Sequence, residues 1–454
     1  MKKLQRRACS ALLVAICLLF GTGVYIYRYA VHGREWASFS GNAAVYENGR
    51  VLTGTVTDRS GLKLASVEDG KRVFAADAAV RTACVHAVGD REGNIGTGAL
   101  RLFAEQLSAY SPVTGLAVEG GTVTLSVDAA LQTEALAALT GRAGAVALMN
   151  YKTGEILCMV SCPTYDPEDP PSEVEEGTYI NRLTGATFAP GSTFKLVTAA
   201  AFIETDDDAY DYEYYCDSVV DYGGGNARVT DVQAHGTVDL EEALEVSCNC
   251  YFGTISDEKI GKKTLKKYTK KAGLMKSYDI DGIHTKKGTF DFPDGGVALA
   301  WTGIGQYNDM VCPCNMMVYM SAIANEGEAV LPSIIDPKSL VGKQVSKMTT
   351  ETKKMIKKST ANSLKSMMRN NVVNHYEDET SFPDLELCAK TGTAEVEGQD
   401  APNSWFTGFL DDEEHPYAFV VLVEEGGFGV DAAGSVANAV LQEAVGNQDD
   451  SADE

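Results

Sequence analysis

The longest apolar stretch of the chain follows a short basic segment at the N-terminus. Residues 1–7 read MKKLQRR, and residues 8–27 then carry no charged side chain until Arg28. A run of this length can form a helix that crosses about 30 Å of hydrocarbon. A cleaved signal peptide is the alternative, but the run is longer than an ordinary signal core and no clear small-x-small cleavage site follows it. The basic segment favours a cytoplasmic N-terminus. We therefore predict a cytoplasmic tail at 1–7, a transmembrane anchor at 8–28 and an extracytoplasmic remainder.

After the anchor the chain is polar, rich in glycine and marked only by short alternating stretches. This region is too small for an enzyme of its own, and we predict a short pedestal at 29–121. From Thr122 an alternating strand leads to Asp128, which can cap the helical run that follows. Residues 143–161, AGAVALMNYKTGEILCMVS, predict a hairpin of two apolar strands joined by a turn at 152–154.

Helical and strand patterns then alternate towards the C-terminus. Residues 194–204, FKLVTAAAFIE, predict a buried helix, whereas 385–394 (LELCAKTGTA) and 417–427 (YAFVVLVEEGG) predict two late strands. Strands at both ends of this region, with helices between them, indicate an α/β or α+β domain whose sheet is completed by strands from both ends of the region. We assign this domain to 122–445 and predict that 446–454, GNQDDSADE, is an acidic disordered tail.

The amino-acid composition restricts the binding partners and the metal chemistry that we expect of this chain. The chain has 454 residues and a formal net charge of −24, which argues against binding to nucleic acid. Of its 11 cysteines, Cys9 and Cys17 lie at or in the anchor, so an odd number remains and at least one is free or pairs between chains. The Cys-x-Cys pairs at 248–250 and 312–314 lack nearby histidines, which favours buried apolar thiols over the alternative of a zinc site. The sequence therefore predicts neither a metal nor a cofactor.

Three short polar motifs each occur twice along the chain. Ser-x-x-Lys lies at 60–63 and 192–195, Ser-x-Asn at 40–42 and 247–249, and Lys-Thr-Gly at 152–154 and 390–392. The earlier copies lie in predicted turns or beside the membrane. The later copies lie at the start of a predicted helix, at the end of another and on a predicted strand, so we expect the later set to be functional.

The later set suits acyl transfer without histidine. Ser192 and Lys195 share one face of a helix, so the lysine can take the proton of the serine. Unpaired backbone N–H groups at the helix start can stabilise negative charge on an attacked carbonyl oxygen. The histidines are scattered and none accompanies a serine motif, which argues against a serine–histidine–acid triad; they are His32, His86, His235, His284, His375 and His415.

In this order the three motifs resemble those of the penicillin-binding proteins, specifically the class B transpeptidases. Longer blocks resemble the family in the same order, including VDAALQTEA, NRLTGATFAPGSTFKLVTAA, GIGQYNDMVCPCNMMVYMSAIANEG and AKTGTAEVEGQDAPNSWFTGF. Together they cover residues 122–444. The segment GTVTDRSGLKLA is similar to the one that opens the family's pedestal. Two positions depart from the family pattern. Asn150 occupies a position where the family usually has an acidic residue, and Cys158 occupies one where an alanine-like residue is expected.

The resemblance implies an α+β fold like that of the serine β-lactamases and D,D-transpeptidases. We expect a five-stranded antiparallel sheet with flanking helices and an all-helical subdomain that carries Ser247 and Asn249. The resemblance also implies roles for the motif residues. Ser192 would be the nucleophile, Lys195 a neutral base, Ser247 a proton relay and Asn249 a ligand of the substrate amide. Lys390, Thr391 and Thr393 would bind the terminal carboxylate, Gly392 would leave space for a substrate strand, and the backbone N–H groups of Ser192 and Thr393 would form the oxyanion hole.

By this resemblance the expected substrates are peptidoglycan stem peptides that end in D-Ala-D-Ala, and the expected inhibitors are β-lactams. A membrane glycan polymerase is a further expected partner. The same site would serve a D,D-carboxypeptidase, a β-lactamase or a β-lactam sensor if water replaced the acceptor amine. The anchor and the pedestal favour the transpeptidase. A non-catalytic scaffold is the alternative from another class, and the complete set of motif residues argues against it.

Overall fold

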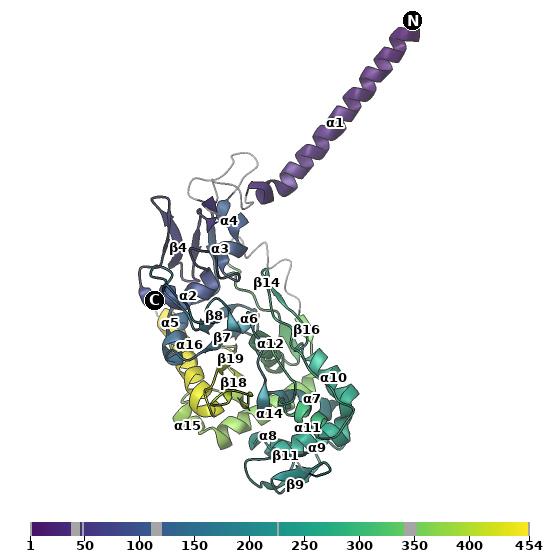
Figure 1. The fold of residues 1–454 in the computed structure, drawn as a ribbon, viewed down its shortest axis with the longest axis vertical. Helices are drawn as coiled ribbons and strands as arrows, with labels where there is room; N and C mark the ends of the chain where they lie inside the picture. The colour runs from purple at the N-terminus through teal and green to yellow at the C-terminus, as the bar shows by residue number, and fades with distance from the viewer. Residues whose placement is uncertain are drawn as a thin grey trace.

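The computed structural model describes residues 2–37, 46–47, 50–109, 120–224, 227–339 and 352–452. Helix α1 (Lys2–Ala37) projects away from the rest of the chain at one end (Figure 1). Its segment Lys2–Gly33 is, among the described helices, the one that is long and apolar enough to cross a membrane, and none of its most apolar window is buried by the protein. These properties fit a membrane anchor and a signal sequence alike.

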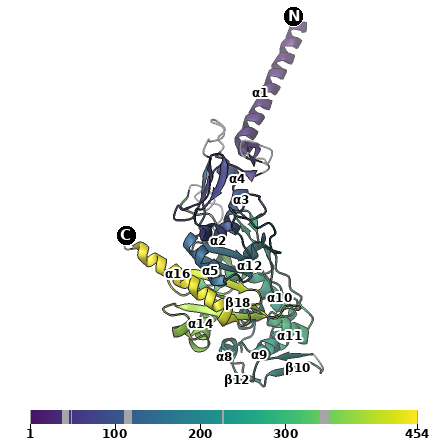
Figure 2. The same ribbon diagram turned by 60° about the vertical axis from the view of Figure 1, so that its left-hand side comes forward.

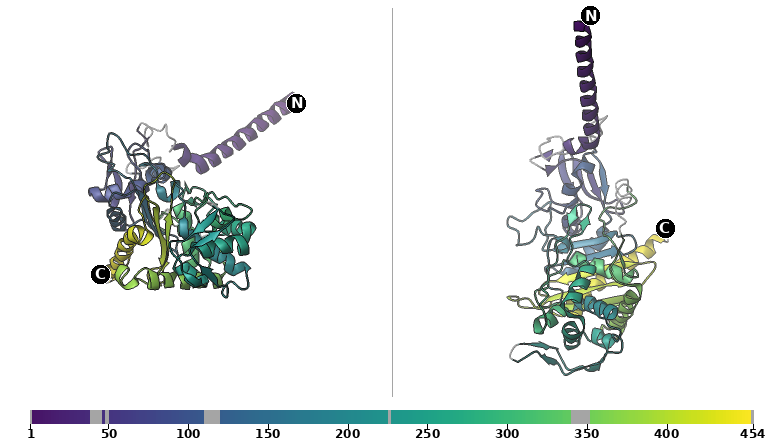
Figure 3. Two further views of the ribbon diagram at one scale, coloured as in Figure 1. Left: turned by 60° about the horizontal axis from the view of Figure 1, so that its bottom comes forward. Right: turned by 90° about the vertical axis from the view of Figure 1, so that its right-hand side faces the viewer.

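A small sheet lies between α1 and the larger body of the protein (Figure 3). Its strands have the order β5-β4-β3-β6, with bounds β3 (Thr55–Thr57), β4 (Lys63–Glu68), β5 (Lys71–Phe74) and β6 (Thr122–Thr124). β6 pairs in parallel with β3, whereas the other pairs are antiparallel. β6 comes from residues that we assigned to the catalytic domain, so strand pairing joins the two predicted domains. The ion pair between Arg81 and Asp166, at 2.6 Å, also links them.

The larger body is built on a five-stranded antiparallel sheet with the strand order β17-β18-β19-β7-β8. The bounds are β7 (Gly144–Asn150), β8 (Ile156–Cys162), β17 (Leu387–Ala394), β18 (Asn403–Leu410) and β19 (Tyr417–Val423). The predicted hairpin and both late strands are confirmed, as is the α+β fold. The hydrophobic pattern missed β18, because its buried residues include the polar Asn403, Ser404 and Thr407, which interrupt the apolar run.

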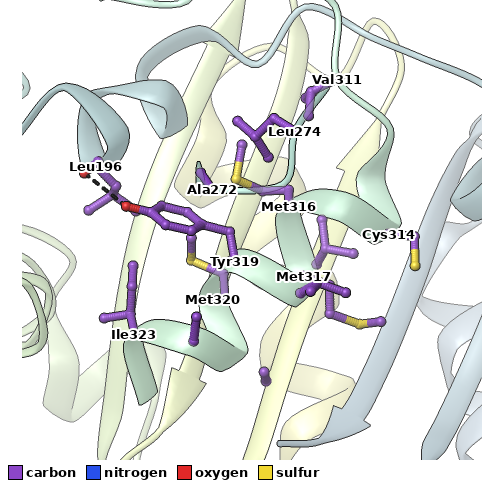
Figure 4. Packing of buried hydrophobic residues seen from close by; sticks show 14 of the residues in the cluster. Leu196, Ala272, Leu274, Val311, Cys314, Met316, Met317, Tyr319, Met320 and Ile323 are labelled. Atoms are coloured by element: carbon purple, nitrogen blue, oxygen red, sulfur yellow. Dashed lines mark hydrogen bonds between the residues drawn. The ribbon is translucent and has the colours of Figure 1, made fainter. Parts of the chain in front are cut away.

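Helices cover both faces of this sheet. On one face Val146 and Leu148 pack with α5 (Ala129–Leu139) and α16 (Ser435–Ala452), which lie side by side in Figure 2. On the other face Ala147 and Met149 pack towards α12 (Pro313–Ala324), every residue of which is buried. Figure 4 shows this helix among its neighbours, with the Tyr319 hydroxyl donating to the carbonyl oxygen of Leu196 at 3.3 Å. α12 thus ties the sheet to the helical part of the body.

The helical part lies on the side of α12 away from the sheet and reaches the end of the molecule farthest from α1 (Figure 1). Its main elements are the 3-10 turn η1 (Gly191–Phe194), α7 (Lys195–Thr205), α8 (Leu240–Glu245), α9 (Asn249–Thr254), the π-helix η2 (Ile255–Ile260), α10 (Gly261–Lys271), α11 (Val297–Gly303) and α14 (Lys358–His375). Two small antiparallel pairs add to the expected helices, β9 (Tyr214–Cys216) with β12 (Gly236–Val238), and β10 (Val219–Asp221) with β11 (Arg228–Thr230).

The remaining elements are short connections between these parts. They are β1 (Tyr46–Glu47), β2 (Arg50–Val51), α2 (Ala78–Val88), α3 (Ala99–Leu102), α4 (Ala104–Ser108), α6 (Arg182–Gly185), β13 (Asp279–Ile280), β14 (Ile283–His284), β15 (Glu328–Val330), β16 (Thr352–Lys354), α15 (Asp378–Ser381) and η3 (Val430–Gly434). α2 packs on α5 and β8 and so helps to join the small sheet to the body.

Candidate active site

The Ser-x-x-Lys motif lies where the turn η1 leads into α7. Ser192 lies on η1, and Lys195 is the first residue of α7. Two glycines allow this turn to approach β17 closely. Gly191 has a φ of +53°, and a Cβ added there would lie 2.7 Å from the carbonyl oxygen of Thr393. A Cβ on Gly392 would lie 2.8 Å from the carbonyl oxygen of Pro190. The motif serine is therefore held against the edge of the sheet.

Lys195 is fully buried and donates three hydrogen bonds. Its Nζ lies 2.5 Å from the carbonyl oxygen of Ser247, 3.1 Å from Ser247 Oγ and 2.7 Å from Asn249 Oδ1. The structure thus brings the Ser-x-x-Lys and Ser-x-Asn motifs together, although more than 50 residues separate them. Within the described residues, no hydrogen bond joins the Ser192 hydroxyl to Lys195. Such bonds are often formed only when substrate is bound.

The backbone between α8 and α9 directs Ser247 and Asn249 towards the lysine. Ser247 lies in the short connection between α8 and α9 and has a φ of +55°, a conformation that a non-glycine residue adopts at a cost of about 1 kcal/mol. Asn249 begins α9, and its Nδ2 donates to the carbonyl oxygen of Thr230 at 3.0 Å, so its Oδ1 is turned to Lys195. The backbone N–H of Asn249 donates to Asp231 Oδ2 at 2.7 Å. Asp231 thereby caps this helix and fixes the position of the motif.

Burial changes the protonation of the two site lysines. Burial, followed by the charge of Lys390, lowers the pKa of Lys195 to about 7. Burial alone lowers the pKa of Lys390 to about 7. A protonated Lys195 satisfies all three of its acceptors. After losing one proton it can still donate to the Ser247 carbonyl and to Asn249 Oδ1, and it gains a lone pair that can accept a proton from a hydroxyl.

The Lys-Thr-Gly motif lies on β17, an edge strand of the sheet. Lys390 is fully buried, whereas Thr391 and Thr393 are partly exposed. Tyr376, at the C-terminus of α14, holds the motif: its hydroxyl accepts from the Thr391 N–H at 3.2 Å and lies 3.1 Å from Thr391 Oγ1. Lys390 Nζ also reaches this hydroxyl at 3.5 Å. An edge strand leaves one row of backbone groups free to pair with an extended peptide.

Sequence reasoning missed three residues that shape this site. Tyr376 and Asp231 are two of them, and Gln306 is the third, because its Nε2 donates to the carbonyl oxygen of Thr393 at 2.9 Å. Gln306 follows Gly305, whose carbonyl oxygen accepts from the Gly191 N–H at 3.0 Å. Gln306 lies within a sequence block that resembled the family, which was a signal for it. Tyr376 and Asp231 belong to no motif and are found only through the fold.

The earlier motif copies lie away from this constellation. Ser60 donates to Asp58 Oδ1 in an exposed turn, with its hydroxyl at 2.7 Å. Lys152 lies in the turn between β7 and β8 and donates to Asn325 Oδ1 at 2.9 Å on the surface. The Ser-x-Asn copy at 40–42 lies outside the described residues. The later copies are thus the ones whose side chains gather in one place.

The comparisons with known proteins agree with this geometry. The penicillin binding protein transpeptidase domain matches residues 144–445. The chain belongs to the penicillin-binding protein transpeptidase family. Its reaction class is that of a peptidoglycan D,D-transpeptidase, and the fold expected from the resemblance is confirmed.

Relatives of this transpeptidase include "Peptidoglycan D,D-transpeptidase PbpA" of Mycolicibacterium smegmatis, which is 26% identical over 381 residues, covering 75% of this chain and 74% of that protein. "Stage V sporulation protein D" of Bacillus subtilis is 30% identical over 308 residues, covering 64% of this chain and 47% of that protein. The solved D,D-transpeptidase domain of a peptidoglycan glycosyltransferase from Eggerthella lenta is 26% identical and has a TM-score of 0.72, covering 87% of this chain and 98% of that chain. PBPA from Mycobacterium tuberculosis shares the fold, with a TM-score of 0.74 at 22% identity, over 87% of this chain and 99% of that chain.

The contacts of Tyr376 predict a specific defect on removing its hydroxyl. Tyr376→Phe should lower the rate of acylation by a fluorescent penicillin about 3- to 10-fold, since one hydrogen-bonding group of the motif is lost. The matched control is Tyr278→Phe, which removes a buried hydroxyl without a described hydrogen-bond partner. The two variants should melt at similar temperatures. An equal loss of acylation in both would show that the effect comes from general packing.

The lowered pKa of Lys195 predicts the pH dependence of acylation. A lysine that acts as a base must be neutral, so if Lys195 has this role the acylation rate should rise with pH through about 7 and then level off. The charge of Lys390 lowers this pKa, so Lys390→Met should move the midpoint of the rise to higher pH as well as reduce the rate. Rates measured by stopped flow from pH 5 to pH 9, on protein shown to stay folded, test both points. A flat profile, or one that falls over this range, would contradict a neutral lysine base.

Proposed function

We propose that Ser192 is the nucleophile of this transpeptidase and that Lys195, held by Ser247 and Asn249, is its base. One observation carries the proposal: a fully buried lysine, one helical turn after the serine, makes its three hydrogen bonds to the Ser-x-Asn motif. A lysine in this environment has a lone pair near neutral pH, which an exposed surface lysine does not. The serine therefore has a proton acceptor without a histidine.

Acylation begins when neutral Lys195 takes the proton of the Ser192 hydroxyl. The serine oxygen attacks the carbonyl carbon between the two terminal D-alanines of a stem peptide. The backbone N–H groups of Ser192 and Thr393 stabilise the negative charge that develops on the carbonyl oxygen. The C–N bond then breaks, Ser247 passes the proton to the leaving amine, and D-alanine departs, leaving an ester on Ser192.

Transfer runs the same steps with an amine from a second stem peptide. That amine attacks the ester carbonyl, gives up one proton to the lysine and serine pair, and displaces the Ser192 oxygen, which regains a proton. A new amide crosslinks the two stems. The ester conserves the energy of the broken amide, so no nucleotide is consumed, which suits a reaction outside the membrane.

Binding of the donor stem uses β17. In the proposed complex Lys390, Thr391 and Thr393 hold the terminal carboxylate, with the charged lysine as the strongest partner. Gly392 lets the stem lie close to the strand, and Asn249 holds the amide on its other side. Tyr376 keeps Thr391 in place for this role.

The proposal also covers inhibition by β-lactams and attachment to the membrane. Structures of Mycobacterium tuberculosis penicillin-binding protein A are described as acyl-enzyme complexes with ceftriaxone and imipenem. We infer that β-lactams acylate Ser192 of this chain in the same way. The basic residues at the start of α1 favour an N-terminus in the cytoplasm and a catalytic body outside, and the length of the apolar run favours an uncleaved anchor. A membrane glycan polymerase would then supply the strands to be crosslinked.

The nucleophile is tested by Ser192→Ala. This variant should lose all covalent labelling by a fluorescent penicillin while keeping its melting temperature, since the Ser192 side chain caps neither η1 nor α7. In vesicles with polymerised glycan, full-length wild type should form crosslinks and Ser192→Ala should form none. Labelling that survives in the variant would place the nucleophile elsewhere. Release of D-alanine without crosslinks by the wild type would favour the carboxypeptidase alternative.

The base is tested by Lys195→Arg, which keeps a cation but cannot supply a neutral amine. Acylation should fall by several orders of magnitude. Lys63→Ala and Lys152→Ala, in the earlier motif copies, serve as controls and should acylate at near the wild-type rate. Mass mapping of the labelled peptide identifies the acylated serine in each case. A comparable loss at either control would show that the wrong motif copy was assigned.

A further inference from the structure

A cluster of metal-ligating side chains lies directly behind the Ser-x-Asn motif. Cys216 at the end of β9, Asp231 after β11, His235 before β12 and Cys248 at the N-terminus of α9 place one ligand atom each within 4.8 Å of one another. The side chains of Cys216 and Cys248 are completely buried, and those of Asp231 and His235 are 3% and 7% exposed. The four residues come from three segments of the chain, namely the end of β9, the connection between β11 and β12, and the start of α9, so the cluster is made by the fold.

The separations suit one tetrahedral ion. Around zinc, thiolate bonds of about 2.3 Å and nitrogen or oxygen bonds of about 2.0 to 2.2 Å place neighbouring ligand atoms roughly 3.3 to 3.8 Å apart. In the structure Cys216 Sγ lies 3.8 Å from Asp231 Oδ2 and 3.7 Å from His235 Nδ1. Asp231 Oδ2 lies 3.5 Å from His235 Nδ1. Three of the six edges of the tetrahedron therefore fall in this range, and the three edges to Cys248 Sγ lie within 4.8 Å.

We propose that Cys216, Asp231, His235 and Cys248 bind one zinc ion that fixes the position of the Ser-x-Asn motif. Two thiolates, one imidazole and one carboxylate form a donor set that favours zinc over magnesium or calcium, which prefer oxygen ligands. On binding, each of the two thiols loses its proton to solvent, while the carboxylate and the neutral imidazole bind as they are.

The position of the cluster gives the ion a structural role in the site. Cys248 is the middle residue of the motif, and its Sγ accepts from the Tyr251 N–H at 3.3 Å as the cap of α9. Asp231 Oδ2 accepts from the Asn249 N–H, and Asn249 Oδ1 accepts from Lys195 Nζ. An ion held by Cys248 and Asp231 therefore fixes both sides of Asn249. Its effect reaches Lys195 through positioning, with no step of the reaction passing through the metal.

The cluster also revises the sequence prediction for the cysteines. Cys248 was expected to be a buried apolar thiol because no histidine lies close to it in a zinc-like spacing. The pairing of β9 with β12 places Cys216 beside His235, and both reach Cys248 only through the fold, so the spacing along the chain carried no signal. Cys250, the other member of that Cys-x-Cys pair, is not among the four convergent ligands.

Metal content of the full-length protein tests the site directly. Protein purified without chelator, and apo-protein titrated with zinc, should each hold about one zinc per chain by elemental mass spectrometry. Cys216→Ala should lose this zinc, whereas Cys158→Ala, which removes a buried thiol from β8, should keep it. Because a core variant can unfold, His235→Gln is measured as well, and its affinity for zinc should fall at least about 10-fold in a folded protein. Substitution by cobalt should give the intense thiolate charge-transfer band of a tetrahedral site.

The possible outcomes are distinct from those that test the nucleophile. Zinc retained by both Cys216→Ala and His235→Gln would overturn the proposal. So would wild-type protein without zinc in which thiol mapping finds Cys216 joined to Cys248 as a disulfide. Removal of zinc from wild type should lower its melting temperature and slow acylation by penicillin, and zinc should restore both. The Ser192→Ala variant should bind zinc as wild type does, so a failure of the catalytic assignment leaves the metal test intact.

Discussion

The main physical constraint on the candidate site is that it holds two buried lysines which, within the described residues, form no ion pair with a carboxylate. Lys195 and Lys390 are both completely removed from water, and the described ion pairs include neither of them. A buried ammonium is costly, and a second one nearby adds repulsion. The protein relieves this cost by allowing the pair to hold fewer than two protons near neutral pH. The remainder of the site can be understood as the structure needed to keep these two amines dry, close and correctly hydrogen-bonded.

Keeping them so requires both halves of the catalytic body. Lys195 begins α7 in the helical part, whereas Lys390 lies on an edge strand of the sheet. The turn that carries Ser192 passes between them, and the Trp405 indole N–H donates to the carbonyl oxygen of Ala189 at 2.9 Å, which holds the chain just before this turn to β18. α12 fills the space behind, with Tyr319 bonded to the backbone of α7 (Figure 4). The distance between the two amines is therefore set by packing of the core and not by the flexible lengths of the side chains.

The sequence predicted the parts of this arrangement that are local. A hairpin with apolar strands, a helix with a serine and a lysine on one face, and a strand carrying Lys390 all leave periodic patterns, and these elements lie where the pattern placed them. β18 left no such pattern because the buried polar residues Asn403, Ser404 and Thr407 interrupt its apolar run. Tyr376, Asp231 and the cluster around Cys248 depend on contacts between distant segments, which no spacing rule encodes. The candidate motifs could be found because each is short, whereas the residues that support them could be found only once the fold was known.

Binding of the donor stem couples the two lysines in the proposed reaction. A carboxylate placed against Lys390 favours the charged form of that lysine, because opposite charges attract more strongly in a dry site. A charged Lys390 in turn lowers the pKa of Lys195, because the two positive charges repel each other. The substrate therefore shifts the shared proton towards the residue that binds it and away from the residue that must act as base. A site with one buried lysine would have to be neutral for catalysis and charged for binding at the same pH, whereas the pair separates these two requirements.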